Sequence, residues 1–280
     1  MTDVAVPTRQ DRETPFAALP RSRRGLPRWL VGAVFPVAAI VLWEIGARAG
    51  VTSSRLIPPP SEIAATIVDL AAAGELLGHL LSTTGRVLAG FALGAMVGTV
   101  LGAATGVSSQ FCALFDPSLQ ALRNIPSIAW TPLFILWFGI FETSKVLMIA
   151  LGVFFPVYLT FSAAIASVDR KLVEVGRVYG LSRAGLIRRI LFPAWLPTYL
   201  IGLRNGLGLG WMFVVAAEFL GASRGLGYLL VDGQQTGRPA VIIAAIVLFA
   251  VLGKLTDRLL TGVGTRFTRW QDGFAGRAGA

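Results

Sequence analysis

Six stretches of this chain are apolar over roughly the 20 residues that a helix needs to cross a lipid bilayer. Lipid offers the backbone no hydrogen-bond partners, so a spanning segment must satisfy its own N–H and C=O groups, as a helix does. Pro126 and Pro132 are expected to interrupt the third stretch. The predicted spans cover about residues 29–47, 87–107, 119–140, 145–168, 197–220 and 239–260. The pattern predicts an all-α, polytopic membrane protein with six transmembrane helices.

The composition agrees with a membrane protein. Hydrophobic residues make up 54% of the 280 residues, charged residues 14%, and the mean hydropathy is +0.68. Soluble domains carry about 25% charged residues. The net charge of +10 does not indicate nucleic acid as a partner, because the basic residues lie beside the apolar spans, where anionic lipid headgroups are their neighbours.

The basic residues also predict the orientation. Of the 25 Lys and Arg, 17 lie in the N-terminal tail, one loop and the C-terminal end from Lys254 onward, and six spans place all three on the same side. Basic loops stay in the cytoplasm, so both termini are predicted to be cytoplasmic. The expected organisation is a basic tail over 1–28, a transmembrane domain over 29–262 with the basic loop at 169–195, and a second tail over 263–280. On the exterior side, a short interfacial helix is expected over 61–77.

Glycines recur every four residues in the second and fifth predicted spans. Residues four apart share one face of a helix, and a face without side chains lets another helix approach closely in lipid. We predict tight packing within one subunit, with a sliding or dimer surface as the alternative. The two series are Gly90, Gly94, Gly98, Gly102 and Gly106, and Gly202, Gly206 and Gly210.

Motifs for covalent chemistry are missing from the sequence. No phosphate-binding loop occurs, because Gly253-Lys254 continues with Leu255 and has no glycine five residues upstream. Cys112 is the one cysteine and His79 the one histidine, which argues against a zinc site or a histidine-based triad. We interpret His79 as an ordinary residue of an exterior loop. The chain is therefore not expected to be an enzyme, and an energy-driven process would need its nucleotide site on another polypeptide.

The basic loop has an internal order of its own. Six Lys or Arg fall within the 25 positions from Asp169 to Pro193, and the spacing indicates two short helices broken at Gly180. Gly180 permits a sharp turn, Ser182 can cap the second helix, and Pro193 is expected to end that helix. Such a rigid segment standing in water between two spans favours docking to a partner.

Four residues of this loop carry a resemblance to a known family. Glu174, Gly180, Ile190 and Pro193 fit the pattern E-A-A-x(3)-G-x(9)-I-x-L-P of the EAA loop in permeases of binding-protein-dependent ABC importers. Two alanines and one leucine of the pattern are replaced. Further runs from about residue 30 to 270 resemble the sulfonate, nitrate and taurine group, above all its aliphatic sulfonate members. These runs are LRNIP at 122–126, PLFILWFGI at 132–140, GLGY at 225–228 and LGKL at 252–255.

The resemblance implies a type I ABC importer permease fold and a homodimer in the bacterial cytoplasmic membrane. It also implies two cytoplasmic ATPase subunits that bind ATP and Mg²⁺, and an extracytoplasmic substrate-binding protein. Glu174, Gly180, Ile190 and Pro193 would then couple the permease to the ATPase. Aliphatic sulfonates are the expected cargo, with nitrate, taurine or a vitamin precursor as alternatives. An ion-coupled secondary transporter is a remoter alternative, because we find no internal repeat and no central Asp or Glu.

Ionisable residues within the spans are the candidates for a substrate path, because a charge at the centre of a bilayer costs roughly 2.5–3.5 kcal/mol or more. An arginine fork can bind two oxygens of a sulfonate. The alternative is that Arg204 pairs with a carboxylate in the bundle or extends to the interface, and that Glu218 pairs at the outer surface. The candidates are Arg123, Asn124, Arg204, Asn205 and Glu218.

Overall fold

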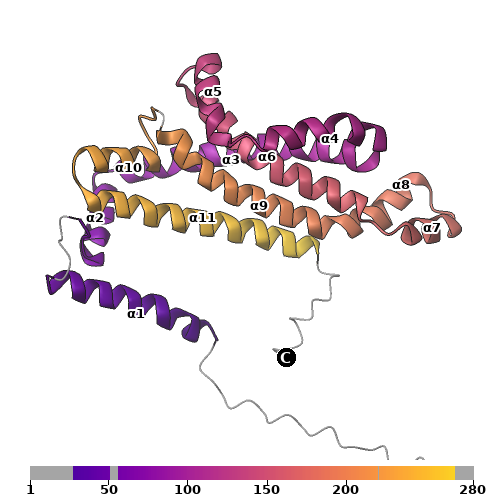
Figure 1. Ribbon diagram of the computed structural model, residues 1–280. Helices are drawn as coiled ribbons and strands as arrows, with labels where there is room; N and C mark the ends of the chain where they lie inside the picture. The colour runs from indigo at the N-terminus through magenta and orange to yellow at the C-terminus, as the bar shows by residue number, and fades with distance from the viewer. Residues whose placement is uncertain (1–27, 51–55, 220, 269–280) are drawn as a thin grey trace, which may run out of the picture.

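The computed structural model describes residues 28–50, 56–219 and 221–268, and its regular structure there is entirely helical. Four helical stretches are long and apolar enough to cross a membrane. They match the second, fourth, fifth and sixth predicted spans, which confirms an all-helical polytopic membrane protein (Figure 1). The four stretches are α3 (Glu75–Val107), α6 (Glu142–Ala166), the continuous stretch Ala184–Phe219 that contains α9 (Phe192–Phe219), and α11 (Pro239–Phe267).

Helix α6 lies between α3 and α9, and glycines set both contacts. A Cβ atom built on Gly90 would lie 2.5 Å from Cγ2 of Ile149, and one on Gly98 would lie 2.9 Å from the carbonyl oxygen of Phe154. At Gly94 the Cβ would overlap the carbonyl oxygen of Ala150. The predicted glycine face of α3 is therefore occupied by the backbone of α6, as expected for close packing in lipid.

The glycine series of α9 meets an adjoining face of α6, and Val153 and Val157 of α6 contact both series. A Cβ on Gly202 would lie 2.7 Å from Cβ of Thr160, and one on Gly206 would lie 2.9 Å from Cγ2 of Val157. Val153 is fully buried between these helices. Both glycine series thus serve packing within one subunit, which confirms the first of the two interpretations.

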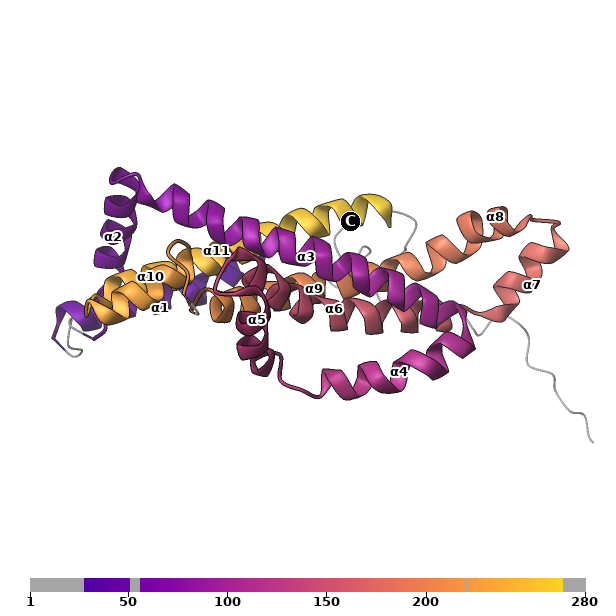
Figure 2. The same cartoon turned by 90° about the horizontal axis from the view of Figure 1, so that it is seen from above.

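The third predicted span is not one continuous helix. Helix α4 (Ser109–Arg123) ends before Pro126, a short 3₁₀ turn, η1 (Ser127–Trp130), follows, and α5 (Thr131–Phe138) comes next. The predicted break at Pro126 is confirmed, whereas Pro132 lies in the first turn of α5, where its missing N–H costs no hydrogen bond. Figure 2 shows α4 and α5 turning away from one side of the layer formed by α3, α6 and α9.

The N-terminal helices differ from the prediction in their boundaries. Helix α1 (Arg28–Arg48) covers the first predicted span and extends one residue beyond it at each end. Helix α2 (Pro60–Ala72), where the interfacial helix is expected, stops short of 77, because Gly74 turns the chain with φ of 77° into α3. Consequently His79 lies within α3, so its placement in an exterior loop was wrong.

The two ends of the bundle carry different structures. One end carries the basic loop with α7 (Arg170–Val178) and α8 (Arg183–Leu186), and we call it the loop end. The other end carries the turn from α9 into α10 (Leu226–Gln235), and we call it the turn end. The two ends lie at opposite extremes of the molecule (Figures 1 and 2). Buried Leu226, Leu229, Val241 and Ala245 pack α10 against α11. Helix α11 continues to Phe267, so the predicted tail at 263–280 begins as helix, while residues 1–27 and 269–280 lie outside the described ranges.

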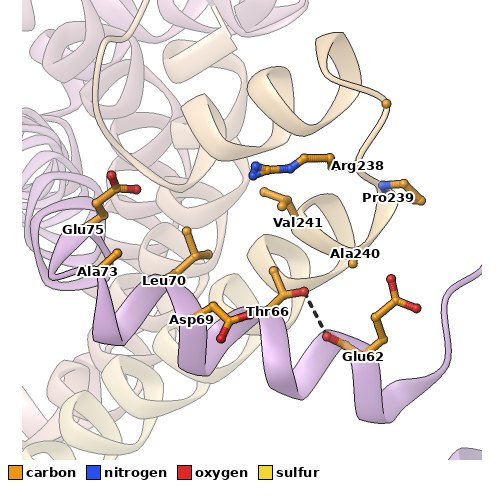
Figure 3. A pocket seen from close by; sticks show the side chains of 11 residues that line it. Glu62, Thr66, Asp69, Leu70, Ala73, Glu75, Arg238, Pro239, Ala240 and Val241 are labelled. Atoms are coloured by element: carbon orange, nitrogen blue, oxygen red, sulfur yellow. Dashed lines mark hydrogen bonds between the residues drawn. The ribbon is translucent and has the colours of Figure 1, made fainter.

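At the turn end an open cavity of about 850 Å³ separates α2 from the turn between α10 and α11. Figure 3 shows the carboxylates of Glu62, Asp69 and Glu75 and the guanidinium of Arg238 around it. The Thr66 hydroxyl donates to the backbone carbonyl of Glu62 at 2.9 Å, so its proton is not available to a ligand. The exposed lining makes this cavity a hollow in the surface and not an enclosed site.

Candidate functional site

The first half of the basic loop is a capped helix that ends at a glycine turn. The Asp169 carboxylate accepts the backbone N–H of Lys171 at 2.9 Å and begins α7. At the other end Gly180 has φ of 67°, its N–H donates to Arg177, and the N–H of Leu181 donates to Gly176. These two bonds form the Schellman motif, in which a glycine closes a helix. The predicted turn at Gly180 is therefore present.

The second half of the loop does not end where we expected. Ser182 caps α8 as predicted, since its hydroxyl oxygen accepts the N–H of Gly185 at 3.2 Å. The expected helix end at Pro193 was wrong, because the chain continues from α8 through a π-helical turn, η2 (Ile187–Leu191), into α9. Pro193 has no N–H for the carbonyl four residues earlier, and the helix widens before it: the N–H of Phe192 donates to Ile187, five residues back.

A close contact at Gly176 joins the two halves of the loop. A Cβ on Gly176 would lie 2.6 Å from Cδ1 of Ile190 and 2.7 Å from Cδ1 of Leu186. Gly176 is buried, although the residues around it on α7 are largely exposed. Glycine in place of alanine at this position therefore lets α7 approach the helix that carries Ile190.

The face of α7 turned away from Gly176 is exposed and partly apolar. Glu174, Val175 and Val178 lie on one side of the helix and are all exposed. Val178 is 86% exposed and Tyr179 80%, although both stand in a loop rich in charge. Exposed apolar side chains in such a setting are typical of a surface that binds a protein.

Arg204 is held by a carboxylate. It donates from Nε to Oδ1 of Asp257 at 2.5 Å and from a second nitrogen to Oδ2 at 2.9 Å, which joins α9 to α11. The fork of Arg204 is thus engaged as the alternative interpretation describes. Asn205 beside it is exposed on the surface of α9.

Arg123 and Asn124 lie at the break between α4 and η1. Arg123 is the last residue of α4 and Asn124 its C-terminal cap, and both side chains are exposed. Among the described residues Arg123 forms no salt bridge, in contrast to Arg204. The break therefore presents a free guanidinium next to an amide.

Glu218, the fifth candidate, is the centre of a buried polar cluster at the turn end. Its side chain is fully buried. Oε1 accepts the hydroxyl of Thr83 at 2.8 Å and Nη1 of Arg86 at 2.7 Å, and Oε2 accepts the N–H of Gly227 at 2.6 Å. Three side chains of α3 contact Glu218 or the turn beside it, and Arg86 also contacts Glu142. We call these side chains the Glu218 cluster: Glu218, His79, Thr83, Arg86 and Glu142.

Arg86 connects three parts of the chain in this cluster. In addition to its hydrogen bond to Glu218, Arg86 donates two hydrogen bonds to the carboxylate of Glu142 at the start of α6, at 2.6 and 2.8 Å. Its Nη1 also donates to the carbonyl oxygen of Arg224 at 2.6 Å. Removing one partner of a buried ion pair strands the other charge and costs about 3–5 kcal/mol. The buried pair of Arg86 with Glu218 therefore fixes α3 to the turn end, whereas Glu142 of α6, which is 61% exposed, adds a weaker contact.

The same cluster begins helix α10. Three successive backbone N–H groups each meet a side chain from another helix: Gly225 meets Nδ1 of His79 at 3.0 Å, Leu226 meets Oγ1 of Thr83 at 2.8 Å, and Gly227 meets Glu218. These donors have no partner within a helix, and a carboxylate at a helix N-terminus also complements the helix dipole. The buried His79 ring stacks on Tyr228 with centroids 5.8 Å apart.

The glycines of the run GLGY are required by Glu218. A Cβ on Gly225, whose φ is 131°, would lie 2.5 Å from Oε1 of Glu218, and a Cβ on Gly227 would lie 2.6 Å from its Cβ. Side chains at either position would displace the carboxylate. The backbone thus encloses the carboxylate closely on this side.

The sequence matches a known protein family over more than half of its length. Residues 90–269 match the model of the family described as "Binding-protein-dependent transport system inner membrane component". The chain belongs to this family. It is thus the membrane-embedded permease component of an ABC importer, and it has no catalytic role of its own.

The similar proteins of known name cover nearly the whole permease. A Bacillus subtilis protein named as an aliphatic sulfonates transport permease is 41% identical over 89% of this chain and 90% of its own length. Its Escherichia coli counterpart is 37% identical over 88% and 95%. The taurine transport permease of Escherichia coli is 31% identical over 82% and 86%. A chain of the inward-facing MetNI methionine ABC transporter shares the fold, with a TM-score of 0.58 at 19% identity over 69% of this chain and 94% of that one.

Sequence reasoning missed Arg86, Glu142 and Thr83 in this permease. A signal was present, because His79, Thr83 and Arg86 recur at the spacing of one helical face just before a long apolar run. The apolar run was taken to begin at 87, which left these polar residues in a connection instead of at the end of a span.

Proposed function

We propose that this permease imports aliphatic sulfonates by alternating access, driven by a separate ATPase that binds the basic loop. The observation that supports the cargo is the 41% identity over 89% of the chain to a permease named for aliphatic sulfonates. The permease performs no covalent step in this proposal. Its work is to expose a path to one side of the membrane and then to the other.

The basic loop is proposed as the ATPase contact. Glu174 and the exposed Val178 and Tyr179 would enter a groove on the ATPase, because they are the apolar and acidic part of an otherwise basic surface. Gly180 would keep the turn beside them narrow, while Ile190 and Pro193 would hold the loop on α9. A push on α7 would reach α9 through the contact between Gly176 and Ile190.

The assembly is proposed to be a homodimer of two six-span chains, with α1 and the broken segment from α4 to α5 supplying the two further spans. Helices α3, α6 and α9 pack too closely at their glycines to leave room for cargo between them. A path must therefore form on the surface of this layer, against a second copy. The basic loop and both termini would face the cytoplasm and the turn end the exterior, where the binding protein delivers the cargo.

Arg123 with Asn124 is the proposed anion contact within the path. Its guanidinium has no carboxylate partner among the described residues, whereas both oxygens of Asp257 occupy the fork of Arg204. A sulfonate carries three oxygens that a planar fork can bind in pairs. Arg204, Asn205 and Glu218 then act in support of the path and not in contact with the cargo.

The cargo is tested by binding and by uptake. The binding protein encoded with this permease is titrated with an alkanesulfonate, taurine and nitrate by calorimetry, and the same three are offered to vesicles that contain the whole transporter. Preferential binding and ATP-dependent uptake of the alkanesulfonate support the proposal. Preference for nitrate, to whose importer permease in Synechocystis the chain is 34% identical over 62% of its length, would refute it.

A further inference from the structure

We propose that Arg86 and Glu218 are positioning residues of a permanent joint at the turn end. The Glu218 cluster stays closed in both the inward-facing and the outward-facing state, and it carries the motion of α9 to α10 and α3. This inference rests on the proposed alternating access and adds to it the residues that hold the turn end together.

The first argument is the saturation of the two charges. Both oxygens of Glu218 accept hydrogen bonds, and all three guanidinium nitrogens of Arg86 donate. The side chain of Arg86 is only 7% exposed, so water cannot replace these partners without opening the bundle. Opening the cluster in each cycle would leave two charges and three N–H groups of α10 without partners.

The second argument is the lack of space for sliding. Gly225 and Gly227 lie against Glu218 so closely that no Cβ fits, and the glycines of α3 and α9 contact α6 in the same manner. Close-packed interfaces of this kind adopt discrete arrangements and do not deform continuously. The start of α10 therefore has no room to slide across Glu218 of α9.

The third argument is the continuity of the helix between the two ends. Ala184–Phe219 is one helical stretch of 36 residues, which extends from the basic loop to Glu218. At about 1.5 Å per residue such a stretch is long enough to cross the bilayer. Displacement of the basic loop is thus carried to Glu218, and the cluster passes it on to α10 and α3.

The first test compares two identical substitutions. Glu218→Gln places an NH₂ group against a donor, Arg86 or Gly227, whereas Glu75→Gln alters an exposed carboxylate at the start of α3 that forms no hydrogen bond or salt bridge among the described residues. Each variant is purified with its ATPase, and ATP hydrolysis is measured with and without the loaded binding protein. We expect Glu218→Gln to lower the stimulation by the binding protein about tenfold, within the usual range of coupling between sites. Basal hydrolysis and the amount of complex should remain, and Glu75→Gln should behave as the wild type.

The second test asks whether the joint ever opens, and it does not depend on the first variant. Cysteines replace His79 and Tyr228, whose rings are stacked, in a chain with Cys112→Ser, and a short bis-methanethiosulfonate reagent links them through two reducible disulfide bonds. Stimulated hydrolysis is compared in the same protein before linking, after linking and after reduction. A permanent joint predicts no change. Loss of stimulation on linking, restored by reduction, would overturn the proposal, as would a Glu218→Gln variant that is stimulated normally.

Both tests read ATP hydrolysis and not uptake of a named cargo. A wrong assignment of the cargo therefore leaves them intact, since the binding protein can be loaded with whichever ligand it binds. If the wild-type complex shows no stimulation at all, the proposed coupling itself fails, and the joint fails with it.

Discussion

Single glycines determine two different properties of this permease. Gly180 has open space around it and is needed for its φ of 67°, whereas Gly94 has ordinary helical geometry and is needed because the backbone of α6 lies against it. The four-residue spacing made the packing role predictable. The helix that packs against this glycine face could not be predicted, because the spacing of the glycines does not identify the opposing helix.

At Gly180 we expect a graded response to Asn, Ala and Val. A left-handed conformation costs an L-residue roughly 1–2 kcal/mol, least for Asn and most for a β-branched residue. Co-purification of the ATPase should therefore fall in the order Gly, Asn, Ala, Val. If Asn and Ala are equally harmful, the glycine is needed for close contact with the ATPase and not for the turn.

At Gly94 the expected effect is on stability. Gly94→Ala pushes a methyl group into the carbonyl of Ala150, and overpacking of this kind costs about 1–3 kcal/mol. Gly85→Ala on the same helix is the matched control, since its Cβ meets no atom within 4 Å. Thermal unfolding in detergent should show a lower midpoint for Gly94→Ala only. Equal midpoints would contradict the assigned packing of α3 on α6.

At the scale of elements the shape of the basic loop depends on the contact between α7 and the helix that carries Ile190. Anchor spacing predicted the two helices, the turn and the cap at Ser182. It did not predict that Pro193 would be included in a π turn, because a proline signals a missing hydrogen bond but not whether the helix ends or widens. The Glu218 cluster was beyond reach for another reason: its partners Arg86 and Glu218 lie 132 residues apart, and no local pattern pairs them.

A compensating pair of substitutions tests the contact between Gly176 of α7 and Ile190. Gly176→Ala should displace α7 and reduce both ATPase binding and stimulated hydrolysis, because the new Cβ meets Cδ1 of Ile190. Ile190→Val removes that methyl group, so the double variant should recover part of the loss. No recovery in the double variant, with Ile190→Val alone unaffected, would show that the two residues do not act through this contact.

At the scale of the whole molecule the described helices form a layer and not a channel. The hydropathy of the chain predicted the membrane class and four of the spans, while the third predicted span is divided between α4 and α5. Where prolines break a span in this way, length and hydropathy do not predict the path of the chain. In the proposed homodimer, closing a path between the chains depends on a second copy and an ATPase, which the sequence of one chain does not describe.

The proposed homodimer predicts the composition of the purified complex. Light scattering in detergent, corrected for bound detergent, should give a mass that corresponds to two permease chains and two ATPase subunits. The matched control is the permease expressed without the ATPase, which should give two chains. A complex with one permease chain that retains stimulated hydrolysis would contradict the dimer.

The central claim is that the ATPase drives transport through the basic loop of this permease. It is tested most directly by ATP-dependent uptake of an alkanesulfonate into vesicles that contain permease, ATPase and binding protein, with Glu174→Lys compared with Glu75→Lys. Glu174 is an exposed acidic residue of the loop, and Glu75 is an exposed acidic residue at the start of α3. We predict uptake by the wild type and by Glu75→Lys, and loss of uptake by Glu174→Lys with the permease still inserted. Undiminished uptake by Glu174→Lys would contradict the account.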